Sequence, residues 1–115
     1  MSSAKRGKGF WGPPKWESLH IDGATFRPEN AEIFVDNLWN MTKVLPCEVC
    51  KKNLTAKLQK YPPEPYLTNN HNAFFYTYFL HDLVNQDLGK KSPPFDEVKA
   101  LYFRALGQEC RDCKV

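Results

Sequence analysis

The chain has 115 residues and a formal net charge of +3, from 16 Lys and Arg against 13 Asp and Glu. This length fits one domain, and no apolar run approaches the roughly 20 residues of a transmembrane helix. The mild basic excess is typical of a solvated surface with a loose tail, and it does not argue for a nucleic-acid or membrane partner. No apolar core follows the basic start at Lys5, Arg6 and Lys8, so we expect no signal peptide.

Prolines and glycines divide the chain into helical segments. Residues 1–9 are rich in Ser, Lys and Gly and predict a disordered tail. The first helix is predicted to begin at residues 11–14, because two prolines there suit a first helical turn. Gly23 either ends this helix, loosens it or lets it pack closely. A second helix is predicted from Pro28, with inward apolar side chains at helical spacing, namely Ile33, Phe34, Leu38, Met41 and Leu45.

Pro46 breaks the chain before a third predicted helix. This helix covers about residues 47–60, and residues 68–70 are candidate N-caps for a fourth helix. The fourth helix is predicted to stop at Gly89. In the third helix, the pattern turns apolar side chains inward and lysines outward: Val49, Leu54 and Leu58 against Lys51, Lys52, Lys57 and Lys60.

A short fifth helix is predicted after the Pro-Pro pair at residues 93–94, and it ends at Gly107. No segment of useful length alternates like a strand. We therefore predict an all-α fold, a four-helix bundle with a short fifth helix. The predicted domain covers residues 10–107, and residues 108–115 form a C-terminal tail.

Four cysteines form two C-x-x-C pairs, Cys47 with Cys50 and Cys110 with Cys113. This pattern leaves two chemistries open, thiol–disulfide redox or a four-cysteine zinc site. Cys47 and Cys50 open a predicted helix, where the helix dipole and unpaired N–H groups favour a thiolate. Zinc sites usually hold each pair in a tight turn, so we favour redox chemistry. A zinc-binding helical interaction module and a disulfide-bonded scaffold without enzymatic role remain alternatives.

A redox-active dithiol also needs an electron acceptor. The strand-rich βαβ setting of thioredoxin-like proteins is absent from the pattern. A helical protein rich in Trp, Tyr and His instead suggests a bound flavin.

Three blocks of sequence carry a family resemblance. They are residues 11–20 (WGPPKWESLH), residues 45–50 (LPCEVC) and residues 80–90 (LHDLVNQDLGK). The first is similar to a helix ending in Trp-x-x-Leu-His, the second to Tyr-Pro-Cys-x-x-Cys, and the third to Leu-His-Asn-x-Val-Asn-x-x-Leu-x-Lys. In this order, the blocks resemble those of the Erv/ALR sulfhydryl oxidase family, over residues 11 to about 102.

The resemblance implies a helical bundle with FAD at its mouth, often as a homodimer. It implies oxidation of two thiols to a disulfide, with reduction of O₂ to H₂O₂. Cys50 is then the sulfur that reacts with the flavin, and Cys47 exchanges with a thiol of a protein substrate or a thioredoxin-like carrier. The matched positions imply FAD contacts from Gly12, Trp16, His20, His81, Val84, Asn85, Leu88, Lys90 and Tyr102.

Each of these positions also has a plain structural explanation. The aromatic residues fit a core, the histidines fit satisfied core or surface positions, and Lys90 fits a solvated helix end. Only their joint placement around the Pro-Cys-x-x-Cys block favours a cofactor site.

The sequence departs from the family pattern at two places. Asp82 stands where the family has Asn, which puts a direct cofactor contact by residue 82 in doubt. The further disulfide of many relatives matches Tyr78 and a residue near Asp96, so it is absent. Stability is then expected from packing, FAD binding and dimerisation.

The role of the second cysteine pair and the location of the protein are implied only by the resemblance. Cys110 and Cys113 are candidates for a mobile shuttle pair that relays electrons from substrate to Cys47 and Cys50. Incidental thiols, or a disulfide that pins the terminus, are the alternatives. We expect host cytoplasm or a virion if a large DNA virus encodes the protein, and the mitochondrial intermembrane space otherwise.

Overall fold

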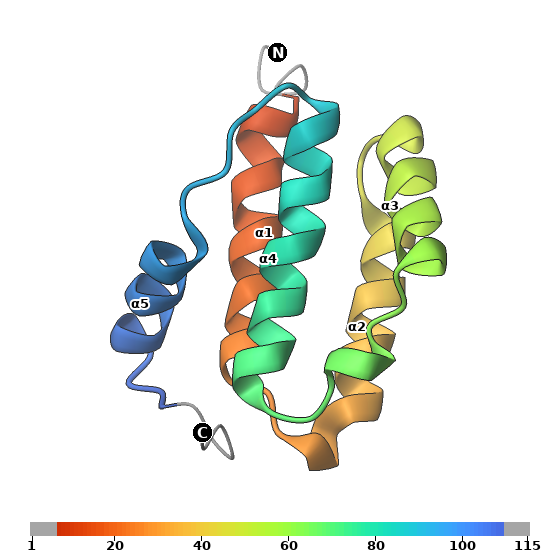
Figure 1. The fold of residues 1–115 in the computed structure, drawn as a ribbon. Coiled ribbons are helices and arrows are strands. Elements are labelled where there is room, and N and C mark those ends of the chain that lie inside the picture. Colours follow the sequence, from red (N-terminus) through yellow and green to blue (C-terminus); the bar gives the residue numbers. More distant parts are fainter. Residues whose placement is uncertain (1–6, 110–115) are drawn as a thin grey trace.

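The structure is a computed structural model and describes residues 7–109, with only the backbone of Lys8. These residues form five α-helices, two short 3₁₀ helices and no strand (Figure 1). The predicted all-α fold is therefore confirmed. No helix in the described part of the chain is long and apolar enough to cross a membrane. The elements are α1 Lys8–Ala24, η2 Pro28–Asn30, α2 Ala31–Val44, α3 Glu48–Lys60, η3 Glu64–Tyr66, α4 Asn70–Asp87 and α5 Phe95–Ala105.

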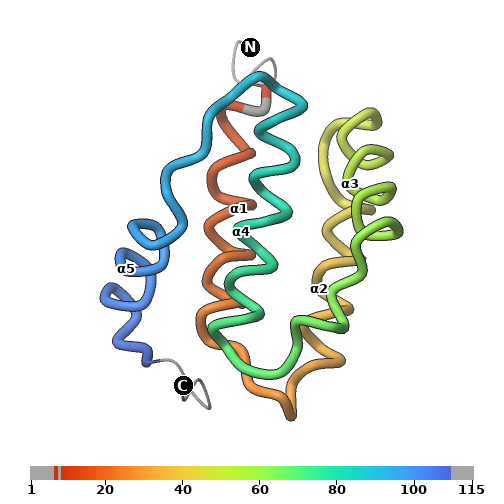
Figure 2. The backbone as a smooth tube through the Cα atoms, in the orientation of Figure 1, coloured from red at the N-terminus to blue at the C-terminus, as the bar shows by residue number. Residues whose placement is uncertain are grey.

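The helices are arranged as two antiparallel pairs. α1 lies along α4, and α2 lies along α3, while α5 packs on the outer side of the first pair (Figure 2). The start of α1, the end of α4 and the α2–α3 turn all lie at the same end of the bundle. Segments far apart in the sequence therefore meet at this end.

The core lies between the two pairs. Its largest fully buried apolar side chains come from α1, α2, α3 and α4, and Phe74 joins a second cluster beneath α5. Every helix of the four-helix bundle thus contributes a side chain that leaves water completely, which stabilises the fold through the hydrophobic effect. These residues are Leu19, Leu38, Leu58, Phe74, Tyr76 and Leu80.

Two apolar residues predicted to face inward do not. Ile33 is 60% exposed and Val49 is 64% exposed, so both predictions are wrong. Ile33 is one residue away from buried Phe34, and a helix turns by about 100° per residue, so Ile33 lies at the solvent side of the buried face that Phe34 and Leu38 form. Val49 lies in the first turn of α3, between the two cysteines, on the outer side of the bundle.

The helix ends follow the local chemistry. Asn69 is the N-cap of α4, where its side-chain oxygen accepts a hydrogen bond from the Asn72 N–H at 2.8 Å. Gly89 and Gly107 have φ of 69° and 60°, a conformation that glycine adopts without strain, and they follow α4 and α5 as predicted. α1 begins at Lys8, ahead of the predicted start at residue 11.

Tyr78 connects α4 to the start of α5. Its ring packs edge-on against Phe95, with 5.2 Å between the ring centroids, and its hydroxyl donates to the Pro93 carbonyl. The resemblance places a disulfide of related proteins at this position. In this chain, aromatic packing and one hydrogen bond connect the same two segments.

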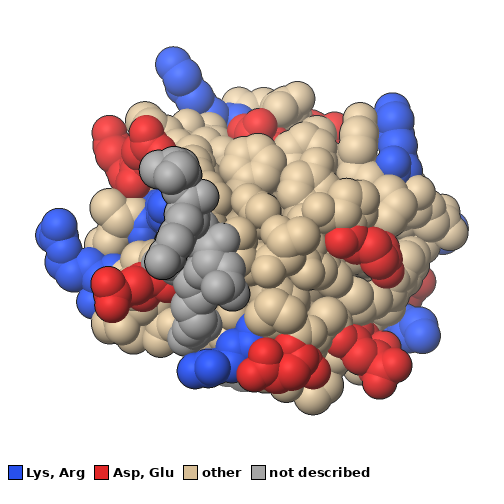
Figure 3. Space-filling view, turned by 60° about the horizontal axis from the view of Figure 1, so that its bottom comes forward, with Lys and Arg blue, Asp and Glu red and all other residues tan. Residues whose placement is uncertain are grey.

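Charged side chains are mixed on the face of the bundle shown in Figure 3. Basic and acidic side chains alternate around a mainly uncharged centre. This face therefore carries no continuous basic patch.

Candidate functional site

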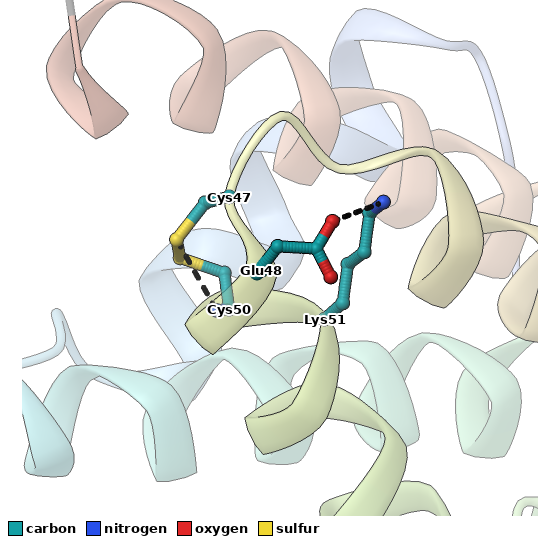
Figure 4. The surroundings of a disulfide bond; sticks show 4 residues. All are labelled: Cys47, Glu48, Cys50 and Lys51. Atoms are coloured by element: carbon teal, nitrogen blue, oxygen red, sulfur yellow. Dashed lines mark hydrogen bonds and ion pairs between the residues drawn. A yellow bond between two sulfur atoms is a disulfide. The ribbon is translucent and has the colours of Figure 1, made fainter.

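The first cysteine pair forms a disulfide at the start of α3. Cys47 and Cys50 are bonded to each other, and their Cα atoms are 5.2 Å apart (Figure 4). Cys47 is the N-cap of the helix, and its sulfur accepts a hydrogen bond from the Cys50 N–H at 3.2 Å. The pair therefore lies at the positive end of the helix, where a sulfur that is released as a thiolate is stabilised.

The lysine that follows the pair is held away from the sulfurs. Lys51 Nζ lies 3.0 Å from Glu48 Oε2, and Figure 4 shows this ion pair pointing away from the disulfide. Since Glu48 compensates the Lys51 charge, the positive environment of the disulfide comes from the start of the helix more than from Lys51.

A cavity of about 330 Å³ opens between the two helix pairs at the same end of the bundle. Such a volume is at the lower end of the range of small-molecule sites. Cys50 lines this cavity, whereas Cys47 does not. The structure also brings to its wall all the positions matched to cofactor contacts, namely Gly12, Trp16, His20, His81, Val84, Asn85, Leu88, Lys90 and Tyr102.

Sequence reasoning missed other residues of the cavity wall. Trp11 and Lys15 lie one residue before Gly12 and Trp16, so extending that helical face would have found them. Lys57 and Asp87 had no such signal, because they come from α3 and α4 and meet only in the folded chain. Lys57, predicted to point outward, instead pairs with Asp87 at the wall of the cavity.

Two histidines and a tryptophan form the inner wall. His20 is only 3% exposed, and its Nε2 lies 3.0 Å from Nδ1 of His81. The ring of Trp16 stacks on the ring of His81, with 4.1 Å between centroids and 5° between planes. Burial, with a smaller effect of His81, lowers the pKa of His20 to about 3. Burial, with a smaller effect of Lys90 that Asp82 opposes, lowers the pKa of His81 to about 4. Both histidines are therefore neutral at physiological pH.

Asp82 is bound to the loop that follows α4. Its carboxylate accepts hydrogen bonds from the Ser92 hydroxyl at 2.6 Å and from the Gln86 amide at 2.8 Å. Asn85 donates to the same Ser92 hydroxyl at 3.0 Å. Asp82 does not line the cavity. Its hydrogen bond from Ser92 instead holds the loop that carries Lys90.

The second cysteine pair, Cys110 and Cys113, lies outside the described residues. The last described residue, Glu109, is attached to the far end of α4, where its carbonyl accepts a hydrogen bond from Asn70 at 2.7 Å. Within residues 7–109, no group of three His, Cys, Asp or Glu side chains is placed to hold a metal ion. Cys47 and Cys50 supply no thiolate to zinc while they are bonded to each other.

A disulfide beside an aromatic, lysine-bearing cavity in a helical bundle defines a class of redox protein, one that couples thiol–disulfide exchange to a bound cofactor. Comparison with known proteins makes the assignment specific. The chain belongs to the Erv1/Alr family, whose model matches residues 14–103.

The chain is also similar to named viral enzymes. It is 30% identical over 100 residues to proteins named FAD-linked sulfhydryl oxidase in African swine fever virus, from a pig isolate of Kenya and a tick isolate of Malawi. Each match covers 84% of this chain and 82% of the viral protein.

FAD is the cofactor of this family, and the cavity fits it chemically. Rings of Trp11, Trp16 and Tyr102 offer flat apolar surface to a flat ring system. Lys15 and Lys90 supply cations for a pyrophosphate. Cys50 is part of the same wall.

Proposed function

We propose that this protein oxidises pairs of protein thiols to disulfides, with Cys47 and Cys50 as its redox-active pair. The single observation that carries this proposal is the position of Cys50 in the wall of the cavity that gathers the matched cofactor positions. Bound FAD would accept the two electrons and pass them to O₂, which becomes H₂O₂.

The geometry supports a division of labour within the pair. A substrate thiolate attacks Cys47, which lies outside the cavity, and the bond between Cys47 and Cys50 breaks. Cys50 is released as a thiolate at the cavity wall, and a mixed disulfide joins substrate and Cys47. A second substrate thiolate then attacks the substrate sulfur of this bond. The substrate leaves as a disulfide, and Cys47 leaves as a thiolate that the Cys50 N–H stabilises.

The second cysteine pair would act as a shuttle between two copies of the chain. The bond from Asn70 to Glu109 holds the tail at the far end of α4. His81 is the cavity residue of α4 nearest to Asn70, about 16 Å along the helix at 1.5 Å per residue. Glu109 is therefore held away from the part of the cavity wall that α4 supplies. The partner that this arrangement would serve is the Cys47 and Cys50 pair of a second chain in a homodimer.

Colour is the first test of the proposal. The purified protein is expected to be yellow, and dithiothreitol is expected to bleach the flavin absorbance in the absence of O₂. Cys50→Ser should keep FAD bound and abolish both bleaching and turnover. A colourless protein that contains stoichiometric zinc would overturn the proposal in favour of the zinc module.

The shuttle is tested separately. Cys110→Ser and Cys113→Ser together should spare oxidation of dithiothreitol and slow oxidation of a reduced protein substrate. Mixing this double variant with Cys47→Ser should restore part of the protein-oxidising activity in a dimer, since each chain then supplies what the other lacks. Unchanged rates with both substrates would contradict the shuttle.

The viral relatives bear on the location of the protein. We propose the host cytoplasm or the virion as its setting, by analogy with enzymes of a large DNA virus. An oxidase in that compartment would make disulfides where the host keeps thiols reduced.

A further inference from the structure

Thr77 on α4 starts a hydrogen-bonded chain that runs from the core to the cavity. Its hydroxyl donates to the Phe74 carbonyl at 2.7 Å. His20 Nδ1 lies 2.8 Å from the Thr77 oxygen, and His20 Nε2 lies 3.0 Å from His81 Nδ1. Thr77 is fully buried and does not line the cavity, whereas His81 does.

The hydroxyl of Thr77 determines the direction of every bond in this chain. A hydroxyl has one proton, and a carbonyl has none to give, so the bond to Phe74 uses the proton of Thr77. The Thr77 oxygen must then accept a proton from His20, which places the His20 proton on Nδ1. The Nε2 of neutral His20 is then an acceptor, and His81 must donate from its own Nδ1. The remaining nitrogen of His81, Nε2, is left with a lone pair.

That lone pair is available to a ligand. Every buried side-chain nitrogen and oxygen of the described residues has a hydrogen-bond partner. The structure gives His81 a protein partner at Nδ1 alone, so its Nε2 is accessible, in a residue that lines the cavity. The stacked ring of Trp16 fixes the plane in which this nitrogen lies.

We propose that Thr77 is a positioning residue, whose hydroxyl sets the tautomers of His20 and His81 so that His81 offers Nε2 to the cofactor as an acceptor. Such an atom selects an N–H or O–H group of FAD, an amine or a sugar hydroxyl, and disfavours a phosphate oxygen. The opposite tautomers would make His81 Nε2 a donor, which disfavours an N–H group and suits an acceptor such as a phosphate oxygen. This inference rests on the proposed cofactor site.

The tautomers can be read directly by NMR. Long-range ¹H–¹⁵N correlation spectra of the histidine-labelled holoprotein at pH 7.5 distinguish a protonated ring nitrogen from one with a lone pair. The chain has three histidines, so His71→Gln and His20→Gln are enough to assign them. We expect both His20 and His81 to carry the proton on Nδ1. A proton on Nε2 of either residue would overturn the proposal.

Two variants of Thr77 test its role. Thr77→Val keeps the shape and removes the hydroxyl, and it should move the protons of His20 and His81 to Nε2 and weaken FAD binding about tenfold. Thr77→Ser keeps the hydroxyl and should retain both tautomers, with affinity within about threefold of wild type. Unchanged tautomers in Thr77→Val contradict the inference. The tautomers are also measurable in protein that binds no FAD, so failure of the cofactor site and failure of this inference are separate results.

Discussion

Gly23 on α1 lies so close to Phe74 on α4 that a β-carbon at residue 23 would be 2.9 Å from the Phe74 Cα atom. The same β-carbon would be 3.1 Å from the Ala73 carbonyl oxygen. Both neighbours are backbone atoms of a helix, which cannot rotate away as a side chain would. The glycine therefore sets the distance between α1 and α4, and with it the distance between His20 on one helix and Thr77 on the other.

We expect Gly23→Ala to destabilise the protein. Alanine is favoured over glycine inside a helix by about 1 kcal/mol, but the added methyl group must push α1 and α4 apart. The net loss in free energy of unfolding should be about 1–3 kcal/mol, measured by chemical denaturation. Gly9→Ala in the same helix is the matched control, because no atom lies within 4 Å of its added carbon. Equal stability of the two variants would mean that α1 and α4 do not need this close approach.

Asp82 should matter through the loop it holds. Asp82→Ala removes the acceptor for Ser92 and Gln86, and we expect a loss of about 1 kcal/mol in stability. The backbone N–H of Lys90, which donates to the Asn85 carbonyl at 2.8 Å, should exchange faster with solvent in this variant. Asp82→Asn retains an oxygen for Ser92 and should change the exchange rate less. Equal exchange in the two variants would show that Asp82 does not order the loop.

Local sequence signals were sufficient to predict the order of the helices and roughly where each one ends. Prolines, glycines and one asparagine cap act within a few residues, and α4 and α5 end two residues before the predicted stops at Gly89 and Gly107. The buried face of each helix was harder to predict. Ile33 and Val49 are apolar and lie close to the helical spacing of the buried residues, although both are exposed. Only the position of the packing partner decides which neighbour of Phe34 is buried, and that position is set by the whole fold.

The candidate site shows the same contrast between what local sequence patterns predict and what only the whole fold determines. Its matched positions were found from sequence blocks, because each block places residues on one helical face. Thr77 was missed since its partner His20 is 57 positions away, and Lys57 since Asp87 is 30 positions away. Nothing in the local pattern of either residue distinguishes it from an ordinary core threonine or surface lysine.

Stability should fall as the pH is lowered from 7 to 5. The pKa of His20 is about 3 in the folded protein against an ordinary value of 6.5, so the unfolded chain binds a proton that the folded chain refuses. The stabilisation is complete above pH 6.5 and is lost as the pH falls toward 3. His20 alone should cost about 2 kcal/mol between pH 7 and 5, and His81 acts in the same direction.

Denaturation of the FAD-saturated protein at pH 5, 6 and 7 measures this slope. His20→Gln should flatten it markedly. His71→Gln is the control, because burial and Lys99 lower the pKa of His71 while Asp96 opposes them, and its ring is less buried than that of His20. A slope that His20→Gln leaves intact would contradict a neutral buried His20.

The ion pair between Lys57 and Asp87 should tune cofactor affinity by charge. Lys57 is 16% exposed and Asp87 is 55% exposed, so the pair itself adds little stability. Both residues line the cavity that would hold the anionic cofactor. Removing Lys57 leaves an uncompensated negative charge there, and removing Asp87 leaves a positive one. We therefore expect Lys57→Gln to weaken FAD binding and Asp87→Asn to strengthen it, each by about threefold to tenfold at low salt.

The double variant should return close to the wild-type affinity, because it changes no net charge. Both single effects should shrink as salt is raised toward 1 M, where charges are screened within about 3 Å. Titration of the protein with FAD, followed by flavin fluorescence, measures all four proteins. If both single variants weaken binding equally, the pair acts instead as a mechanical connection between α3 and α4, and its charges are incidental to the cofactor.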